Sequence, residues 1–509
     1  MHLKARQEPG RPCHLRASGS PDQGNEGWAT GGRESEQPVV PRKPGNRDRR
    51  DPVEGRGCRD TELMEGPMAG RLSPGDISTR LHRIAELART APGMVLTTLA
   101  HHIDQAWLYE AWNRTRKDGA PGIDGETAEA YAADLDEHLS HLLDRFKCGS
   151  YVAPPVRRVH IPKASGGQRP IGIPTLEDKV LQRAVAMVLD AVYEQDFLPC
   201  SYGFRPGKSA HEAVERLWQG LMEMRGGWVI DLDIEAFFDS LDHSRLRAIL
   251  DERIRDGVIR RGIDKWLKAG VLEEGTVTRA VSGTPQGGVI SPILANIYLH
   301  HAMDRWFEQE VRPTLRGQAL LVRYADDAVL AFTDKAEAER VREELRERLS
   351  GYGLRLHATK TRLVPFKRPL LVPQGGDFSS RPGTFDFLGF THYWGTTRRG
   401  AWAVKRKTSR SRFRRAVAHL NEWCRRFRHY PVTMQHRYLC RLILGHCQYY
   451  GITGNSIALG RFRQRLQRIW RYWLTRRSQK GKMTWERFRR LLTRYPLPKA
   501  LAVHSVCRT

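Results

Sequence analysis

The chain of 509 residues lacks the sequence features of several protein classes. Its eight cysteines form no Cys-x-x-Cys pair and show no zinc-ligand spacing, so they are predicted to be reduced, mostly structural thiols. No uncharged apolar run reaches the roughly 18 residues that span a membrane, and the N-terminus has no apolar signal-peptide core. We therefore predict a cytoplasmic protein that does not associate with membranes.

Apolar residues are scarce over residues 1–75, where Gly, Pro, Arg, Glu and Asp dominate without periodicity. Such a composition does not bury enough apolar surface to offset the loss of chain entropy, so we predict disorder. Met64 and Met68 stand close to the first ordered sequence. The alternative prediction is that translation starts there and that residues 1–75 are a mis-assigned leader.

Acidic residues are almost missing from residues 401–509. This segment holds 27 lysines and arginines against two acidic residues, Glu422 and Glu486. The preceding 400 residues hold 57 basic and 55 acidic side chains, so nearly all of the net charge of +27 lies in the last fifth of the chain. This asymmetry predicts a polyanionic partner, and nucleic acid in particular, for the C-terminal segment.

Hydrophobic periodicity predicts an α+β fold. Helices are expected over residues 77–88, 99–112, 126–146, 177–197, 210–224, 291–310, 335–351 and from 408 onward. Strands are expected over residues 156–161, 168–173, 228–234, 321–322, 328–332, 354–356 and 385–390. In the helix that follows the Gly-rich loop at 284–290, we expect Ser291 as N-cap and Pro292 in the first turn.

Asp326 and Asp327 interrupt two apolar runs and predict the turn of a buried hairpin. Two adjacent carboxylates repel each other and favour a bound cation. If Asp233, which ends another buried strand, lies in the same sheet, the three carboxylates can hold two divalent cations, with the backbone carbonyl of Ile234 as a further ligand. Asp231 would sit deeper in its strand. Such a site suits nucleotidyl transfer, in which one cation activates a 3′-hydroxyl and the other stabilises the leaving pyrophosphate.

Transfer of a nucleotide also needs positive charge on the triphosphate. Lys163 and Arg169, on two strands joined by a Gly-Gly turn, are positioned to supply it.

Seven short motifs occur in order along the chain. They are Ile161-Pro-Lys163, Arg169-Pro-Ile-Gly-Ile-Pro-Thr175, Tyr202-Gly-Phe-Arg-Pro206, Asp233-Ile-Glu-Ala-Phe-Phe-Asp239, Pro285-Gln-Gly-Gly-Val-Ile-Ser-Pro292, Tyr324-Ala-Asp-Asp327 and Phe387-Leu-Gly-Phe390. This succession resembles the reverse transcriptases of bacterial group II introns, the intron-encoded maturases, over residues 95–509. The resemblance implies a right-hand polymerase, with fingers and palm over 76–400 and a helical thumb and maturase domain over 401–509.

The resemblance also assigns roles to residues. It implies that Asp233, Asp326 and Asp327 are catalytic and, with Ile234, bind two Mg²⁺ ions, for which Mn²⁺ can substitute. The implied nucleotide-binding residues are Lys163, Arg169, Phe238 (which excludes a 2′-hydroxyl), Gln286 and Lys360. The implied template and primer contacts are Tyr324, Gly389 and Phe390, the last two forming the primer grip. The alternatives are a core ring at Phe238, a turn residue at Gln286 and a solvated lysine at Lys360.

The basic C-terminal segment resembles the thumb and maturase domain of class C members of the family at residues 439–455, 485–488 and 495–498. Arginines and aromatic residues alternate there, which suits phosphate contact and base stacking. We expect Trp470, Trp473 and Tyr449 to be mostly core and the arginines to bind RNA. The arginines selected are Arg410, Arg414, Arg415, Arg425, Arg461 and Arg465.

A paired-cysteine endonuclease pattern is missing after the thumb, as in class C. The primer would then come from a nick, a replication fork or a reverse-splicing product. The function expected from the resemblance is an RNA-directed DNA polymerase that copies RNA into cDNA and binds its intron RNA to assist splicing and retrohoming. Its partners would be intron RNA, an RNA template, a DNA primer or target and dNTPs, with nucleoid association on the target. The alternatives are an RNA-binding splicing factor with a vestigial polymerase site, and a retron, diversity-generating, CRISPR-linked or phage-defence enzyme.

Overall fold

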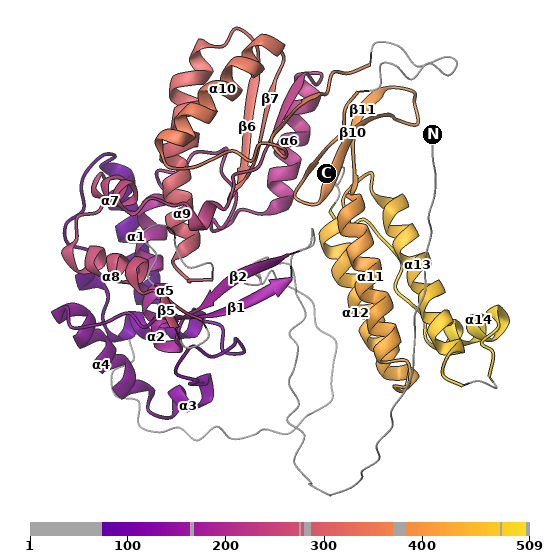
Figure 1. Ribbon diagram of the computed structural model, residues 1–509, viewed down its shortest axis with the longest axis horizontal. Helices are drawn as coiled ribbons and strands as arrows, with labels where there is room; N and C mark the ends of the chain where they lie inside the picture. The colour runs from indigo at the N-terminus through magenta and orange to yellow at the C-terminus, as the bar shows by residue number, and fades with distance from the viewer. Residues whose placement is uncertain are drawn as a thin grey trace, which may run out of the picture. The chain divides into compact units, whose positions relative to one another are not determined.

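The computed structural model describes residues 74–162, 167–273, 276–278, 283, 287–369, 382–478 and 481–504 (Figure 1). Within these residues the fold mixes helices with three small sheets in which most neighbouring strands are antiparallel. Residues 1–73, which make up nearly all of the predicted leader, lie outside the described residues, so its disorder stays a prediction.

Five α-helices lie in the N-terminal part of the described chain, the fifth of them after the first two described strands. They are α1 (Pro74–Thr90), α2 (Gln105–Arg114), α3 (Ala128–Ala133), α4 (Leu135–Cys148) and α5 (Leu176–Tyr193). The single helix predicted over 99–112 is wrong, because a 3₁₀ turn (Ala100–His102) comes first and the Asp104 side chain then caps α2 by accepting from the amide of Trp107. The helix predicted over 126–146 is also wrong as one element. It breaks at Asp134, whose ψ of 44° is not helical.

The first sheet contains the hairpin predicted over 156–173. Its strands are β1 (Val156–Pro162), β2 (Gln168–Ile173), β4 (Val271–Glu273) and β5 (Thr276–Thr278), in the order β2-β1-β4-β5. Strands β1 and β2 are antiparallel and place Ile161 opposite Arg169, which confirms the predicted hairpin. Strand β4 joins β1 in parallel.

The second sheet contains the hairpin of the carboxylate pair. Its strands are β3 (Trp228–Leu232), β6 (Ala319–Tyr324), β7 (Asp327–Phe332) and β8 (Arg362–Pro365), in the order β6-β7-β3-β8. The antiparallel β6–β7 pair confirms the predicted hairpin. The strand predicted over 354–356 is wrong, because only Leu356 forms a bridge there, to Ile234.

Alternation along β7 explains why helices cover both faces of this sheet. Ala328, Leu330 and Phe332 belong to the core that includes α10 (Lys335–Gly351), whereas Val329 and Ala331 belong to the core that includes α6 (Ala210–Glu223). Every residue of β7 after Asp327 is buried, so this carboxylate stands at the point where the core ends.

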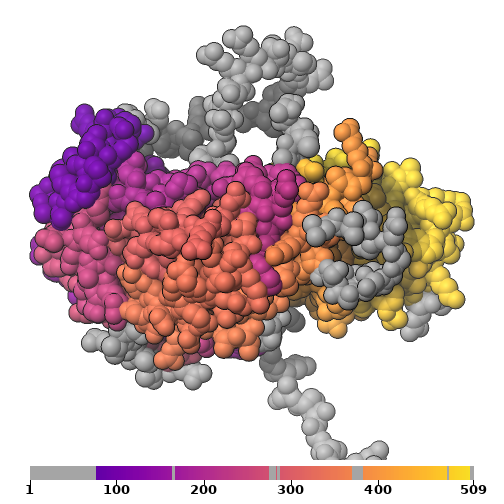
Figure 2. All heavy atoms as spheres, turned by 90° about the horizontal axis from the view of Figure 1, so that it is seen from above, coloured from indigo at the N-terminus to yellow at the C-terminus, as the bar shows by residue number. Residues whose placement is uncertain are grey.

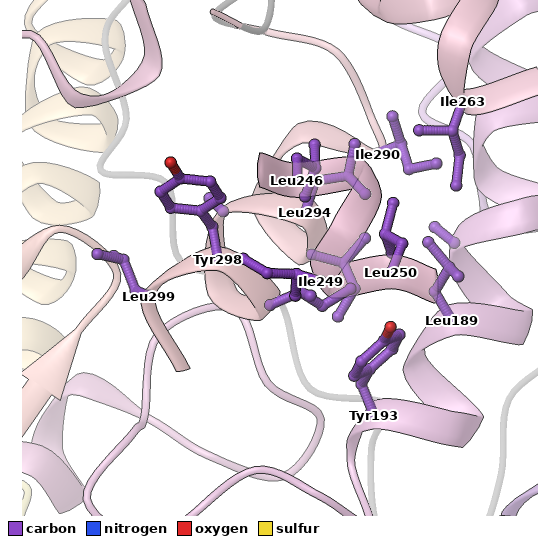
Figure 3. Packing of buried hydrophobic residues seen from close by; sticks show 14 of the residues in the cluster. Leu189, Tyr193, Leu246, Ile249, Leu250, Ile263, Ile290, Leu294, Tyr298 and Leu299 are labelled. Carbon is purple, nitrogen blue, oxygen red and sulfur yellow. The ribbon is translucent and has the colours of Figure 1, made fainter. Parts of the chain in front are cut away.

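Helices α7 (His243–Asp251), α8 (Gly257–Lys268) and α9 (Ser291–Leu299) extend the first core. Leu246, Ile249 and Leu250 of α7 pack between α9 and α5, as Figure 3 shows. The helix predicted over 291–310 exists, but it continues after α9 as π-helical turns over His300–Asp304 and Trp306–Val311. The expectation of Ser291 as N-cap is wrong, because Ile290 takes that place and Ser291 is the first helical residue; Pro292 does lie in the first turn.

The third sheet has the order β11-β10-β9 and leads into a helical region. Its strands are β9 (Phe385–Phe387), β10 (Phe390–Thr396) and β11 (Trp402–Thr408); the helices are α11 (Arg410–Arg426), α12 (Val432–Tyr450), α13 (Ser456–Thr475) and α14 (Trp485–Arg494). Strand β11 lies within the segment 401–509 that was predicted to be helical, so the helical part begins only at Arg410. The Trp218 indole of α6 donates to the carbonyl of Val404 of β11 at 2.8 Å. Figure 2 shows magenta and orange parts of the chain next to each other.

Candidate active site

Asp326 and Asp327 stand at the tight turn between β6 and β7. Tyr324 pairs with Asp327, which leaves Ala325 and Asp326 as the two central residues. Ala325 has a φ of 56°, a left-handed conformation that a residue with a side chain rarely adopts. Gly203 lies against this residue so closely that a Cβ on it would come within 2.3 Å of the Ala325 nitrogen. The Tyr-Gly-Phe-Arg motif therefore supports the turn with its backbone.

The register of the sheet brings Asp233 to the same turn. Leu232 of β3 pairs with Ala328 of β7, so the next positions along the two strands are Asp233 and Asp327. Burial, with the charges of Asp326 and Asp233 added, raises the pKa of Asp327 to about 7, although part of its side chain reaches solvent. Burial also raises the pKa of Asp326; the charge of Arg169 opposes this shift and that of Asp233 adds to it. The three carboxylates thus act on one another, as expected of a site that needs a cation.

A bridge between Ile234 and Leu356 fixes the backbone after Asp233. The amide of His357 donates to the carbonyl of Asp233 at 2.8 Å, and the amide of Glu235 donates to the carbonyl of Arg355 at 2.8 Å. The bridge therefore does not use the carbonyl of Ile234.

Lys360 reaches the same carboxylate. Its Nζ lies 3.0 Å from Oδ2 of Asp233, and both side chains are partly exposed. Asp231, two residues earlier, pairs instead with Arg362 at 2.9 Å. The two aspartates thus have different partners: Asp231 pairs with Arg362 of β8, and Asp233 pairs with Lys360 at the end of the sheet.

The donor set fits hard divalent cations, because carboxylates and a backbone carbonyl are the oxygen ligands such ions prefer. Among the described residues, no three acidic, histidine or cysteine side chains already stand at the spacing that encloses an ion. Asp233 is engaged by Lys360, so binding of a cation there requires this ion pair to open or shift.

The residues predicted to bind the nucleotide are only partly described. Lys163 and Gln286 lie outside the described residues. Arg169 is an exposed residue of β2, and its charge acts on Asp326. Phe238 is half-buried in a 3₁₀ turn (Phe237–Asp239) and contacts the ring of Phe237 edge-on at 5.3 Å between centroids. The ring of Phe238 therefore packs against the core on one side and is partly exposed to solvent on the other.

The Phe387-Leu-Gly-Phe390 motif is the two-residue turn between β9 and β10. Leu388 and Gly389 have φ values of 49° and 80°, and Phe387 pairs with Phe390, which matches a type I′ hairpin turn. The ring of Phe390 is 1% exposed and stacks on Tyr449 at 5.8 Å. The side chain of Phe390 therefore packs in the core. In the predicted primer grip, the contact with the primer would come from the backbone of this turn. Tyr324, the other predicted contact, is half-buried beside Phe204.

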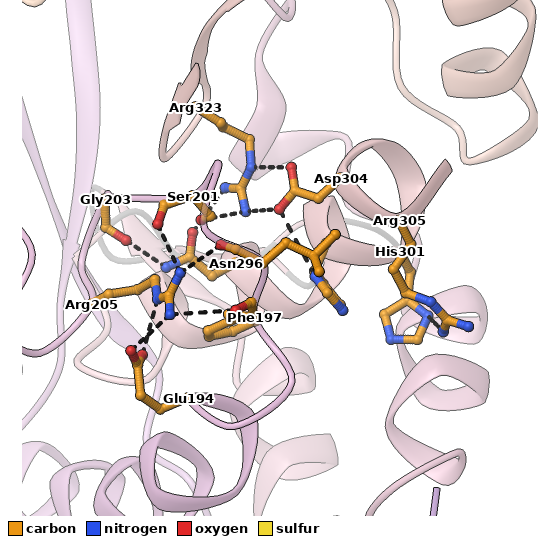
Figure 4. Close-up of polar contacts among 12 residues, drawn as sticks. Glu194, Phe197, Ser201, Gly203, Arg205, Asn296, His301, Asp304, Arg305 and Arg323 are labelled. Atoms are coloured by element: carbon orange, nitrogen blue, oxygen red, sulfur yellow. Dashed lines mark hydrogen bonds and ion pairs between the residues drawn. The ribbon is translucent and has the colours of Figure 1, made fainter. Parts of the chain in front are cut away.

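Sequence reasoning missed a buried polar network behind the carboxylate turn (Figure 4). Arg323 is fully buried and pairs with Asp304 of the π-helical turn at 2.5 Å. The same guanidinium donates to Ser201 Oγ at 2.7 Å, to Asn296 Oδ1 at 3.0 Å and to the carbonyl of Ala325 at 3.1 Å. The only signal in the sequence was an arginine within an otherwise apolar strand, where a buried charge requires partners.

The arginines predicted to bind RNA all reach the surface. Arg410, Arg414, Arg415 and Arg425 are exposed on α11, and Arg461 and Arg465 are exposed on α13. Arg425 is paired with Glu422 at 2.8 Å. The two helices pack against each other through residues such as Leu420, Leu459 and Leu466, which leaves the arginines outside this core.

Comparison with known proteins identifies the class. The family model described as reverse transcriptase (RNA-dependent DNA polymerase) matches residues 161–392, a range that contains both β3 and the β6–β7 turn. Protein YkfC of Escherichia coli (strain K12) is 38% identical over 323 residues, which cover 56% of this chain and 84% of that protein. The chain belongs to the reverse transcriptase family and is an RNA-directed DNA polymerase.

Further relatives include proteins encoded by introns. The group II intron-encoded protein LtrA of Lactococcus lactis subsp. cremoris is 40% identical over 189 residues, 37% of this chain and 31% of LtrA. Nuclear intron maturase 4 (mitochondrial) of Arabidopsis thaliana is 28% identical over 150 residues, 29% of this chain and 18% of that protein. The chain is thus similar to group II intron-encoded proteins and intron maturases, and it aligns with less than a third of LtrA. In the described part of the chain, every helix is too short or too polar to cross a membrane.

Proposed function

We propose that this protein copies RNA into cDNA by two-metal nucleotidyl transfer and binds its intron RNA to assist splicing and retrohoming. The observation that carries the catalytic part is the placement of Asp233 beside Asp327 by strand register, with Asp326 in the adjoining turn. Two Mg²⁺ ions, or Mn²⁺ in their place, would activate the primer 3′-hydroxyl and stabilise the leaving pyrophosphate.

The residues of the chain then have distinct roles in this proposal. Asp233, Asp326 and Asp327, with the carbonyl of Ile234, hold the metal ions. Arg169 and Lys163 of the β1–β2 hairpin neutralise the triphosphate. Lys360, whose Nζ lies 3.0 Å from Oδ2 of Asp233, would contact a phosphate oxygen of the nucleotide in place of this carboxylate. Phe238 lies under the sugar and excludes a 2′-hydroxyl, and Gln286 positions the incoming nucleotide.

The right-hand arrangement is proposed on the same basis. Fingers and palm would extend from residue 76 through the third sheet, and the thumb would comprise α11 to α14. The exposed arginines of α11 and α13 would contact the phosphates of the intron RNA, since nearly all of the net charge lies in this part of the chain. Template RNA, a DNA primer or target and dNTPs complete the set of partners.

Primer extension on an RNA template tests the proposal. The purified wild-type protein, with Mg²⁺ and dNTPs, is expected to make full-length cDNA, whereas Asp233→Asn and Asp326→Asn make none and still bind RNA. Glu339→Gln, which removes an exposed carboxylate on α10, serves as the matched control and should extend normally. Extension by either aspartate variant would remove the assigned metal site. If the wild type binds RNA tightly but does not extend, the chain acts as a splicing factor.

A further inference from the structure

The aromatic rings of the C-terminal helices divide into core and surface. Trp470 is 0% exposed, and its indole donates to Gln435 Oε1 at 2.8 Å. Tyr472 and Trp485, in contrast, are each 44% exposed. Exposed rings of this size are available to a partner outside the chain, but exposure alone does not identify one.

An arginine covers each of these two exposed rings. The guanidinium carbon of Arg471 lies 4.2 Å from the centroid of Trp485, and that of Arg476 lies 4.5 Å from the centroid of Tyr472. Arg471 is held in place because its Nη1 donates to the carbonyl of Met483 at 2.9 Å. Arg471 and Tyr472 are consecutive residues of α13, so the two stacks begin at adjacent positions of this helix; the two ring–arginine stacks together are here called the stacking surface.

The positive charge around the stacking surface indicates which kind of partner it can bind. The two acidic residues of the segment, Glu422 and Glu486, are both paired with arginines, at 2.8 Å and 2.6 Å. Apart from Arg406, which pairs with Glu215 of α6, no other basic side chain among the described residues of this segment forms an ion pair, so most of its positive charge is uncompensated, which disfavours a cationic partner and attracts a polyanion. A ring backed by a guanidinium offers a π-face to a nucleobase while the positive charge lies near its phosphate.

We propose that the stacking surface, formed by Tyr472 and Trp485 with Arg476 and Arg471, binds unpaired bases of single-stranded RNA. Bases within a duplex are already stacked on their neighbours, so exposed rings discriminate for single strands, whereas arginines that contact only phosphates do not. The proposal rests on the proposed function only in taking RNA as the partner, and it does not depend on the metal site.

The test compares three ligands of matched sequence: a single-stranded RNA of about 12 nucleotides, its RNA duplex and the single-stranded DNA. Binding of the full chain is measured by fluorescence anisotropy over a range of salt concentrations. Tyr472→Ala and Trp485→Ala should each weaken binding of the single-stranded RNA at least ~5-fold and leave duplex binding unchanged. The slope against salt should stay the same, because no charge is removed.

Conservative and positional controls accompany these variants. Tyr472→Phe and Trp485→Phe keep a π-face and should retain binding. Tyr430→Ala removes a ring that is 45% exposed but that no arginine of the described residues stacks on, and it should bind RNA like the wild type. Thermal unfolding of every variant verifies that the helices remain folded.

Several outcomes overturn the proposal. These are an equal loss on single strands and duplex, no loss at all, or the same loss in Tyr430→Ala. A loss confined to single-stranded DNA would make DNA the partner and RNA the wrong assignment. Primer extension by the wild type reports on the proposed function separately, so its absence together with a selective loss of single-stranded RNA binding would leave this inference standing.

Discussion

Arg323 and Asp304 form an ion pair from which solvent is excluded. Neither side chain has any exposed surface; Nε lies 2.7 Å from Oδ1 and Nη2 lies 2.5 Å from Oδ2. The pair joins strand β6 to the π-helical turn that follows α9, and a third hydrogen bond of the guanidinium reaches the carbonyl of Ala325. The turn that carries Asp326 and Asp327 is therefore held from behind by a charge pair.

Breaking this pair should destabilise the protein. Asp304→Asn leaves the guanidinium of Arg323 buried without its counter-charge, so the free energy of unfolding should fall by about 3–5 kcal/mol. Denaturant unfolding followed by circular dichroism measures the change. Glu344→Gln, which breaks the exposed pair with Arg340, is the control and should cost less than about 1 kcal/mol. Equal losses of unfolding free energy in the two variants would show that the buried pair stabilises the protein no more than an exposed pair does.

A methyl group at Gly203 should displace the carboxylate turn. Its Cβ would lie 2.3 Å from the nitrogen of Ala325, and the three nearest atoms all belong to the backbone of Tyr324 and Ala325, which cannot move aside as a flexible side chain can. Gly203→Ala should therefore lower both stability and primer-extension rate. Gly445→Ala, in α12 with nothing within 4 Å of the added Cβ, should instead stabilise the protein by about 1 kcal/mol. An active, stable Gly203→Ala variant would contradict the close approach.

Removal of the ring of Phe238 should change sugar selection. In the proposed role the ring blocks a 2′-hydroxyl, so Phe238→Ala should incorporate ribonucleotides that the wild type rejects. Primer extension with dNTPs and with NTPs gives the ratio of the two efficiencies. Because Phe238 is half-buried against Phe237, Phe238→Leu serves as a packing control. An unchanged ratio in Phe238→Ala would mean that the ring serves only packing.

Neutralising arginines of α11 should weaken RNA binding and flatten its salt dependence. Each lost phosphate contact lowers the slope of log K against log salt by roughly 0.7 for a single strand. The variant replaces Arg410, Arg414 and Arg415 by glutamine. The control makes the same charge change at Arg340, Arg342 and Arg346 of α10, which are paired with glutamates. If both triple variants lose the same affinity, the effect comes from net charge and not from a binding surface.

His392 should contribute to acid sensitivity. It is 0% exposed, stacks on Phe385 at 4.9 Å, and burial together with the charge of Arg406 lowers its pKa to about 3. The unfolded chain takes up this proton near pH 6.5, so stability is lost as pH falls from about 6.5 towards 3. His392→Phe should lose less stability over this interval, as measured by denaturant unfolding at a series of pH values. Parallel curves for the variant and the wild type would exclude this contribution.

Local patterns in the sequence predicted most of the elements near the site. The β1–β2 and β6–β7 hairpins and the long helices were predictable because alternation and helical periodicity record which face is buried. Strands β4, β5, β8, β10 and β11 and helices α7 and α8 escaped prediction. Strand β11 carries the buried Arg406, which pairs with Glu215 of α6 at 2.8 Å. Because one of its inward-facing residues is charged, the sequence of β11 lacks the alternation of apolar and polar residues that predicts a strand.

The sequence by itself determined the identity of the three aspartates, the order of the motifs and the concentration of positive charge after residue 400. These features depend only on which residues occur and in what order, so the sequence alone shows them. Only the tertiary structure decided that Asp233 stands beside Asp327, that Arg323 and Asp304 hold the turn, and which aromatic rings are core and which face solvent. Each of these depends on contacts between residues distant in sequence, and the burial that gives such contacts their strength exists only in the folded chain.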